Sequence, residues 1–217
     1  MATPLAGLRR LLDRPLAPSP KAPAGQGEER CDLCAQALAG EHPHLVNVET
    51  RRLLCACRAC ALLFTHGGAG KGKIRAVPDR YRRIGDVVLD EATWERLKIP
   101  VRTAFLFTSS GAGKVVAFYP SPAGATESLL ALDGWEELVA KNPVLAGMEP
   151  DVEALLVHGP RDAGFEAYLV PINACYELVG RVRQTWRGFD GGAGWDEIAA
   201  FFATLRERSV EVGATAS

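Results

Sequence analysis

The spacing of the cysteines constrains the fold of this chain more than any other feature of its sequence. Two turns of the form Cys-x-x-Cys occur, Cys31-Asp-Leu-Cys34 and Cys57-Arg-Ala-Cys60, with 22 residues between them. A tetrahedral metal ion needs four soft donors at one point, and each such turn presents two thiolates from one tight loop. We therefore predict that Cys31, Cys34, Cys57 and Cys60 bind one metal ion and hold residues 30–80 together as a small module.

The segment between the two turns has the pattern of a β-hairpin. Residues 42–48 and 52–55 contain runs of apolar residues, and Glu49-Thr-Arg51 separates them, which predicts strand, turn and strand. Two cysteine turns joined by a hairpin are typical of a zinc ribbon. The first module is therefore expected to be zinc-ribbon-like.

Zn²⁺ is the expected ion because four thiolates form the closed tetrahedral shell of structural zinc sites. Iron remains an alternative, since thiolates alone do not identify their metal. A rubredoxin-like iron site usually carries Pro or Gly next to its cysteines, and these turns have neither. A disulfide framework would be expected in a secreted chain, and no secretion signal is recognisable, so the cytoplasm is the expected location.

Three further potential ligands lie between the two turns. Strand alternation places Cys55 on the same face as Cys57, where it could replace a ligand, bind alongside one or only fill space, and we favour the last. His42 and His44 could replace a cysteine or contact a partner. Because four cysteines complete the shell, solvent exposure is the expectation for both histidines.

Charge is distributed unevenly although the formal net charge is only −1. Residues 51–83 contain nine basic residues and one acidic residue, whereas residues 121–170 contain nine acidic and two basic residues. The two blocks could attract each other within the molecule, meet partners of opposite charge, or form ordinary solvated surfaces. The near-neutral total argues against a dedicated nucleic-acid coat.

The rest of the chain predicts an α+β protein, in which the small four-cysteine module is followed by a mixed domain over residues 81–208. Antiparallel hairpins are expected at 104–119 and 152–170, and two C-terminal helices at 173–187 and 195–206. Residues 1–29 are expected to form a short helix and a Pro/Gly-rich linker, residues 61–65 a strand, and residues 209–217 a flexible tail. No run of eighteen apolar residues is present, so no membrane span is expected.

No pattern of catalytic residues appears, and we predict that the protein is not an enzyme. A serine elbow and a Cys/His pair are both missing, and a closed four-cysteine shell leaves no open position for a hydrolytic zinc. The glycine-rich stretch 67–73 resembles a phosphate-binding loop, but Ile74 replaces the hydroxyl that would hold magnesium. Cys175 falls on the apolar face of a predicted helix and is expected to be buried.

Several longer strings resemble one bacterial family. They are Cys31-Asp-Leu-Cys34, His44-Leu45, Thr50-Arg-Arg-Leu-Leu-Cys-Ala-Cys-Arg-Ala-Cys60, Pro171-Ile-Asn-Ala-Cys-Tyr-Glu-Leu-Val-Gly180 and Trp186-Arg-Gly-Phe-Asp-Gly-Gly192. The resemblance covers most of residues 30–208 and is to an uncharacterised family encoded beside nickel–iron uptake hydrogenases. It implies a context of hydrogenase assembly, maturation or electron transfer, and it brings no catalytic residues.

The favoured function is that of an accessory or adaptor protein whose metal-supported module docks on a protein partner, such as a hydrogenase component or maturation factor. The first alternative is a nucleic-acid-binding zinc ribbon that uses Arg51, Arg52, Arg58, Lys71 and Lys73, with an affinity that falls steeply with salt. The second is a one-electron carrier with iron at the four cysteines, which would be coloured.

Overall fold

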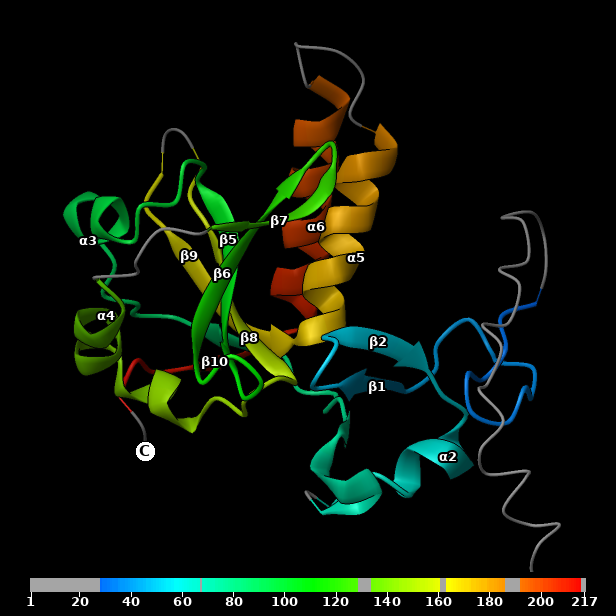
Figure 1. The fold of residues 1–217 in the computed structure, drawn as a ribbon. Coiled ribbons are helices and arrows are strands. Elements are labelled where there is room, and N and C mark those ends of the chain that lie inside the picture. The colour runs from blue at the N-terminus through cyan, green and yellow to red at the C-terminus, as the bar shows by residue number, and fades with distance from the viewer. Residues whose placement is uncertain (1–27, 67, 129–133, 161–162, 186–191, 216–217) are drawn as a thin grey trace, which may run out of the picture.

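A computed structural model of the chain describes residues 28–66, 68–128, 134–160, 163–185 and 192–215 (Figure 1). The predicted N-terminal helix and all but the last two residues of the predicted linker lie outside this description. The described residues form an α+β fold with two sheets, which confirms the predicted fold class.

The smaller sheet belongs to the cysteine-rich module and has the strand order β2-β1-β3, with both pairs antiparallel. Its strands are β1 (His44–Asn47), β2 (Arg52–Cys55) and β3 (Ile74–Ala76). The predicted hairpin is therefore present. Its turn is tightened by the Asn47 side chain, whose Oδ1 accepts hydrogen bonds from the backbone N–H groups of Glu49 and Thr50.

The larger sheet has seven strands in the order β10-β4-β9-β8-β5-β6-β7, and every neighbouring pair except β10 and β4 is antiparallel. The strands are β4 (Arg82–Ile84), β5 (Thr103–Ser109), β6 (Lys114–Ser121), β7 (Gly124–Ser128), β8 (Glu153–His158), β9 (Glu166–Pro171) and β10 (Val210–Val212). The two predicted hairpins correspond to β5–β6 and β8–β9.

Helices cover both faces of the larger sheet (Figure 1). Successive side chains of a strand point to opposite faces, so the nearly continuous apolar residues of β5 and β8 need cover on both sides. One face packs against α3 (Glu91–Arg96), α4 (Trp135–Lys141) and the 3-10 helix η2 (Pro143–Gly147). The other face packs against α5 (Ile172–Thr185) and α6 (Gly192–Arg208).

The sequence correctly places Cys175 on the buried face of α5. Its side chain is fully buried beside Ala174, Leu178 and Val179. Burial raises the pKa of the Cys175 thiol well above its ordinary value. This cysteine is therefore an inert core residue.

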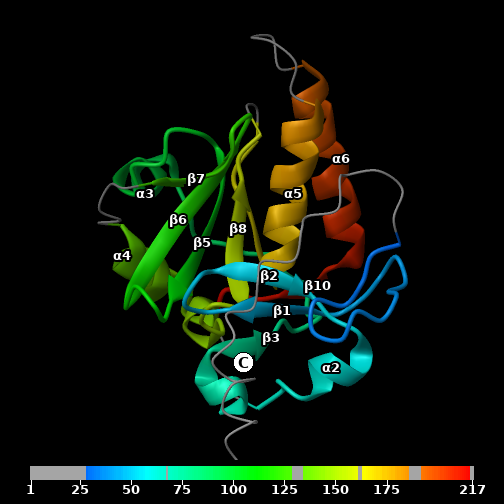
Figure 2. The ribbon, with the colours of Figure 1, turned by 45° about the vertical axis from the view of Figure 1, so that its right-hand side comes forward.

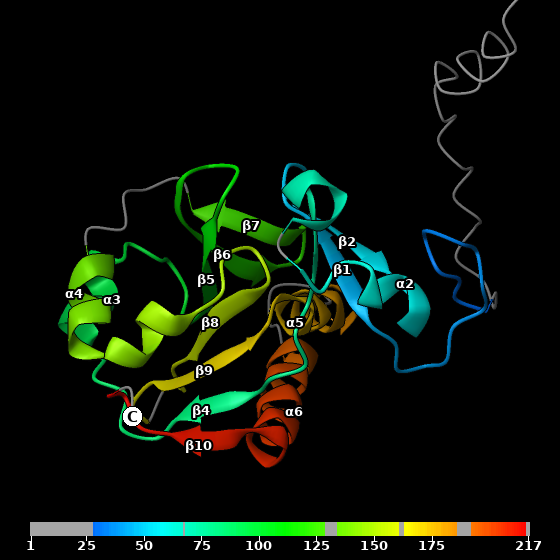
Figure 3. The ribbon, with the colours of Figure 1, turned by 90° about the horizontal axis from the view of Figure 1, so that it is seen from below.

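The two sheets share a packing interface through β1. Leu45 lies in the small core around the cysteines, whereas its neighbour Val46 points the opposite way into the core between the larger sheet and α5. Figures 2 and 3 show the small sheet beside one end of α5. The cysteine-rich module is therefore packed against the larger domain through part of its sheet.

Two local predictions were wrong. Residues 61–65 do not form a strand, because α2 (Arg58–Leu62) begins immediately after Cys57, whose sulfur caps the helix by accepting a hydrogen bond from the N–H group of Cys60. The stretch from 209 is also no flexible tail over its described part. Val210–Val212 form β10, and Ala214 is buried.

The glycine-rich stretch is not a phosphate-binding loop in its described part. A short 3-10 helix, η1 (Ala69–Gly72), leads directly into β3. A phosphate-binding loop needs an α-helix at this point, whose N-terminal amides face the phosphates. The prediction against nucleotide binding at this loop is therefore supported by its conformation.

Candidate metal centre

The four predicted ligands come together at one point. The sulfur atoms of Cys31, Cys34, Cys57 and Cys60 all lie within 4.8 Å of one another, and those of Cys34 and Cys57 are 3.8 Å apart. Zinc–sulfur bonds of about 2.3 Å in a tetrahedron place neighbouring sulfur atoms about 3.8 Å apart. The four cysteines can therefore hold a metal ion.

The first cysteine turn is fixed by backbone hydrogen bonds and by one carboxylate. The N–H group of Ala35 donates to the carbonyl oxygen of Cys31 at 2.8 Å, and Ala35 itself has a positive φ of 62°. Asp32 links this turn to β2 through two hydrogen bonds with the backbone of Cys55, one as donor and one as acceptor. Its N–H group donates to the carbonyl oxygen of Cys55 at 2.8 Å, and its Oδ2 accepts from the N–H group of Cys55 at 2.7 Å.

The second cysteine turn is the start of a helix. Cys57 caps α2, and its carbonyl oxygen accepts a hydrogen bond from the N–H group of Ala61 at 2.9 Å. Cys60 lies in the first turn of the helix, so its sulfur is on the same side as that of Cys57. Cys31 and Cys57 are buried, whereas Cys34 is exposed and Cys60 is half-buried. The centre therefore lies at the surface of the module.

The electrostatics of the centre favour a bound cation. Burial raises the pKa of Cys31, but hydrogen bonds from the backbone of Cys57, Cys34 and Leu33 outweigh burial and lower this pKa to about 6. The neighbouring sulfur atoms of Cys34 and Cys57 raise the pKa of Cys60 to about 12. Without an ion, the sulfur of Cys31 therefore ionises more readily than that of Cys60, whose pKa is raised chiefly by hydrogen bonding with the sulfur atoms of Cys34 and Cys57. A divalent cation favours the thiolate form of all four cysteines.

The three further potential ligands are grouped separately from the four cysteines. The ligand atoms of His42, His44 and Cys55 lie within 4.8 Å of one another. The expectation of solvent exposure was wrong for His42, whose side chain is only 6% exposed. The predicted turn at 49–51 sets His44 opposite Ala56, whereas the observed turn at 48–51 sets His44 directly opposite Cys55, so the predicted hairpin did not bring these residues together.

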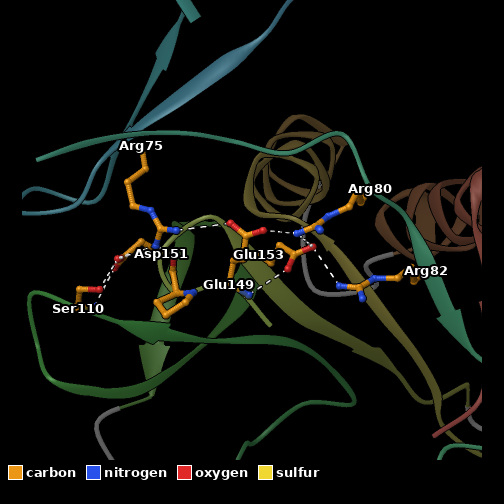
Figure 4. Close-up of polar contacts among 8 residues, drawn as sticks. Arg75, Arg80, Arg82, Ser110, Glu149, Asp151 and Glu153 are labelled. Carbon is orange, nitrogen blue, oxygen red and sulfur yellow. Dashed lines mark hydrogen bonds and ion pairs between the residues drawn. The ribbon is translucent and has the colours of Figure 1, made fainter. Parts of the chain in front are cut away.

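The basic and acidic blocks meet inside the molecule (Figure 4). Arg75 of β3 lies 3.5 Å from Glu149 and 3.8 Å from Asp151, measured between guanidinium nitrogen and carboxylate oxygen. Glu153 is fully buried at the start of β8, and its Oε1 is 3.1 Å from Arg82 and 3.2 Å from Arg80. Of the arrangements that the sequence left open, mutual attraction is the one found for these residues.

Three of the five basic residues named as candidates for nucleic-acid binding also form ion pairs within the molecule. Arg51 pairs with Glu127 at 3.1 Å, Arg52 lies 3.9 Å from Asp32, and Lys73 pairs with Glu49 at 2.8 Å. These ion pairs reduce the positive charge available to phosphates. Arg58 and Lys71 are exposed.

Comparison with known proteins identifies one family. The family of unknown function (DUF5947) matches residues 30–209, from the residue before the first cysteine turn to the residue after α6. No curated protein and no solved structure matches the chain. Within the described residues, none of the helices has the length and apolar character needed to cross a membrane.

Proposed function

The chain belongs to the family of unknown function (DUF5947), and we propose from its own geometry that it is a non-enzymatic zinc-binding accessory protein. It acts through protein–protein contacts in the assembly, maturation or electron transfer of a nickel–iron hydrogenase, in the cytoplasm. The hydrogenase context is supported by the sequence strings shared with the family encoded beside such enzymes. The protein contacts are supported by the surface of the cysteine-rich module.

Exposed leucines beside the cysteines are the observation that carries this proposal. Among the described residues, six large apolar side chains are exposed, and three of them lie in or next to the cysteine turns: Leu33 at 45%, Leu62 at 60% and Leu63 at 68%. Leu33 lies inside the first turn, and the other two follow Cys60 at the end of α2. Exposed apolar residues that cluster mark protein contact sites more often than isolated ones do.

Zinc supports this role by keeping the two turns rigid. The segment from 28 to 43 contains no strand of a sheet and only one isolated β-bridge, between Arg30 and Ala37, and its two cysteine sulfur atoms meet those of the second turn at the centre. An ion that fixes both turns presents Leu33, Leu62 and Leu63 in one arrangement, which reduces the entropy lost when a partner binds. A four-sulfur zinc site is redox-inert, whereas iron at the same cysteines would colour the purified protein.

Replacement of Leu62 and Leu63 by aspartate is expected to abolish binding of the partner and to leave the metal content unchanged. Both side chains are exposed, so the two aspartates should change the folding stability only slightly. Burial of their charges against an apolar partner surface is unfavourable, so binding should be lost. The measurement is affinity purification of the tagged full chain from its native host, with mass spectrometry of the proteins retained and metal analysis of the complex.

The matched control is Val210→Asp, which charges a side chain that is also 68% exposed but lies on β10 of the larger sheet. This control is expected to retain the hydrogenase subunit or maturation factor that the wild-type chain retains. Absence of any hydrogenase protein from the wild-type complex would remove the proposed context. Equal retention by wild type and the leucine variant would show that the cysteine turns are not the contact surface.

A further inference from the structure

A second group of metal-binding side chains lies in the hairpin that joins the two cysteine turns. The ligand atoms of His42, His44 and Cys55 lie within 4.8 Å of one another. Strand register explains the arrangement, because His44 on β1 is directly opposite Cys55 on β2. His42 precedes His44 by two residues, and the ring centroids of the two histidines are 4.8 Å apart.

The surroundings of His42 are those of a metal ligand. Its Nδ1 lies 3.0 Å from the carbonyl oxygen of Ala39 and 3.6 Å from a carboxylate oxygen of Glu29. Both neighbours are acceptors, so Nδ1 carries a proton and donates it. Metal-bound histidines commonly donate their other ring N–H group to a carbonyl or a carboxylate in this way, which fixes the tautomer and the ring orientation.

The second ring nitrogen of His42 is buried without a hydrogen bond. The side chain is only 6% exposed, and within the described part of the chain Nε2 has no hydrogen-bond partner. With the proton on Nδ1, this nitrogen presents a lone pair. A buried acceptor left unpaired costs free energy, so natural structures pair such atoms with protein, water or an ion.

We propose that His42, His44 and Cys55 bind a second divalent transition-metal ion, through Nε2 of His42, an imidazole nitrogen of His44 and the sulfur of Cys55. Two imidazoles and one thiolate form a borderline-soft donor set that suits Zn²⁺. Three protein ligands leave the fourth tetrahedral position to water or to a group from a partner. The four-cysteine centre, by contrast, needs no outside ligand.

The two ions would be neighbours in the sequence and in the fold. Cys55 ends β2, and Cys57 caps α2 only two residues later, so one short segment supplies a ligand to each ion. Asp32 of the first cysteine turn also holds the backbone of Cys55. The second ion would therefore brace the hairpin against the same turns that the first ion organises.

Zinc content and X-ray absorption of the full chain test this inference. The protein is loaded with Zn²⁺, loosely bound metal is removed on a chelating resin, and the zinc per chain and the zinc K-edge spectrum are measured. The expected result is about two zinc ions per chain with an average of about 2.5 sulfur neighbours per zinc, together with imidazole nitrogen at about 2.0–2.1 Å. The variant His42→Ala/His44→Ala is expected to hold about one zinc, with about four sulfur neighbours.

The control is His66→Ala, which removes an exposed histidine of the same module and should keep both ions. Cys55→Ala is an independent variant that removes only the sulfur donor, and it should lose one ion and keep the four-sulfur spectrum. A wild-type chain with a single zinc and a spectrum of sulfur alone overturns the proposal, however the variants behave. A double-histidine variant that still holds two ions and retains the nitrogen signal overturns it as well.

Discussion

Cys57→Ser is expected to lose the metal ion of the four-cysteine centre and to unfold the cysteine-rich module. Cys57 is one of the four predicted ligands, caps α2 and lies in the small core with Leu45 and Ala61. Structural zinc sites of this kind contribute about 10–16 kcal/mol of apparent binding free energy in isolated zinc-finger peptides at pH 7, and this binding drives folding. A small core around four thiolates cannot replace a contribution of that size.

Amide hydrogen exchange and metal analysis measure this loss. Protection is expected to disappear from β1, β2 and β3, while β5, β8 and β9 keep theirs because most of their contacts lie within the larger domain. The matched control is Cys175→Ala, which removes a buried cysteine outside the centre and should leave the metal content unchanged. Full metal content in Cys57→Ser would show that this cysteine is not a ligand.

Glu153→Gln is expected to lower the free energy of unfolding by about 1–3 kcal/mol, because the buried carboxylate that pairs with Arg82 and Arg80 is replaced by a neutral amide. The carboxylate of Glu153 is fully buried, contacts Arg82 at 3.1 Å and Arg80 at 3.2 Å, and accepts a hydrogen bond from the N–H group of Glu149 at 3.0 Å. The Nε atom of Arg82 is already buried and without a hydrogen bond within the described residues. Removal of the negative charge therefore makes an existing deficit larger.

Denaturant unfolding of the metal-loaded protein measures this cost. Glu95→Gln, an exposed position on α3, is the control and should change stability by less than about 0.5 kcal/mol. Adding Arg82→Met to Glu153→Gln should restore part of the loss, since it removes the unpaired cation, and the two effects should not add. A cost below about 1 kcal/mol for Glu153→Gln would mean that water or a neighbouring group compensates the arginines.

Local sequence signals accounted for the positions of the four cysteines. A Cys-x-x-Cys turn is a property of four consecutive residues, and the hairpin between the turns has its own turn and strand residues. The same hairpin did not reveal the His42, His44 and Cys55 cluster, because counting outward from the predicted turn at 49–51 sets His44 opposite Ala56, and only the observed turn at 48–51 sets His44 opposite Cys55.

Features that depend on contacts between residues far apart in the sequence could not be predicted from local patterns. The run Ala61-Leu-Leu-Phe-Thr65 has no clear period, so its apolar residues fit a strand as well as a helix, and the cap at Cys57 decides for α2. The opposite charges of the two blocks indicated attraction as one option, but not that Glu153 would be buried between Arg80 and Arg82. That arrangement follows from the packing of β8 against β9, with β4 on the other side of β9.

The strands β4 and β10 pair in parallel although they lie far apart in the sequence, so β4 is synthesised long before its partner. Arg82 is aligned with Val210, so β4 emerges from the ribosome 128 residues before the strand that completes this side of the sheet. Its other partner, β9, also follows it in the sequence, and once β9 has paired with it β4 is an open edge until β10 emerges, which in other proteins invites pairing with a second chain. Arg82 and Arg83 place two positive charges on this three-residue edge. Charges on a short edge strand disfavour pairing with a second chain, so the arginines that later pair with Glu153 and Glu211 are expected to oppose aggregation of the nascent chain.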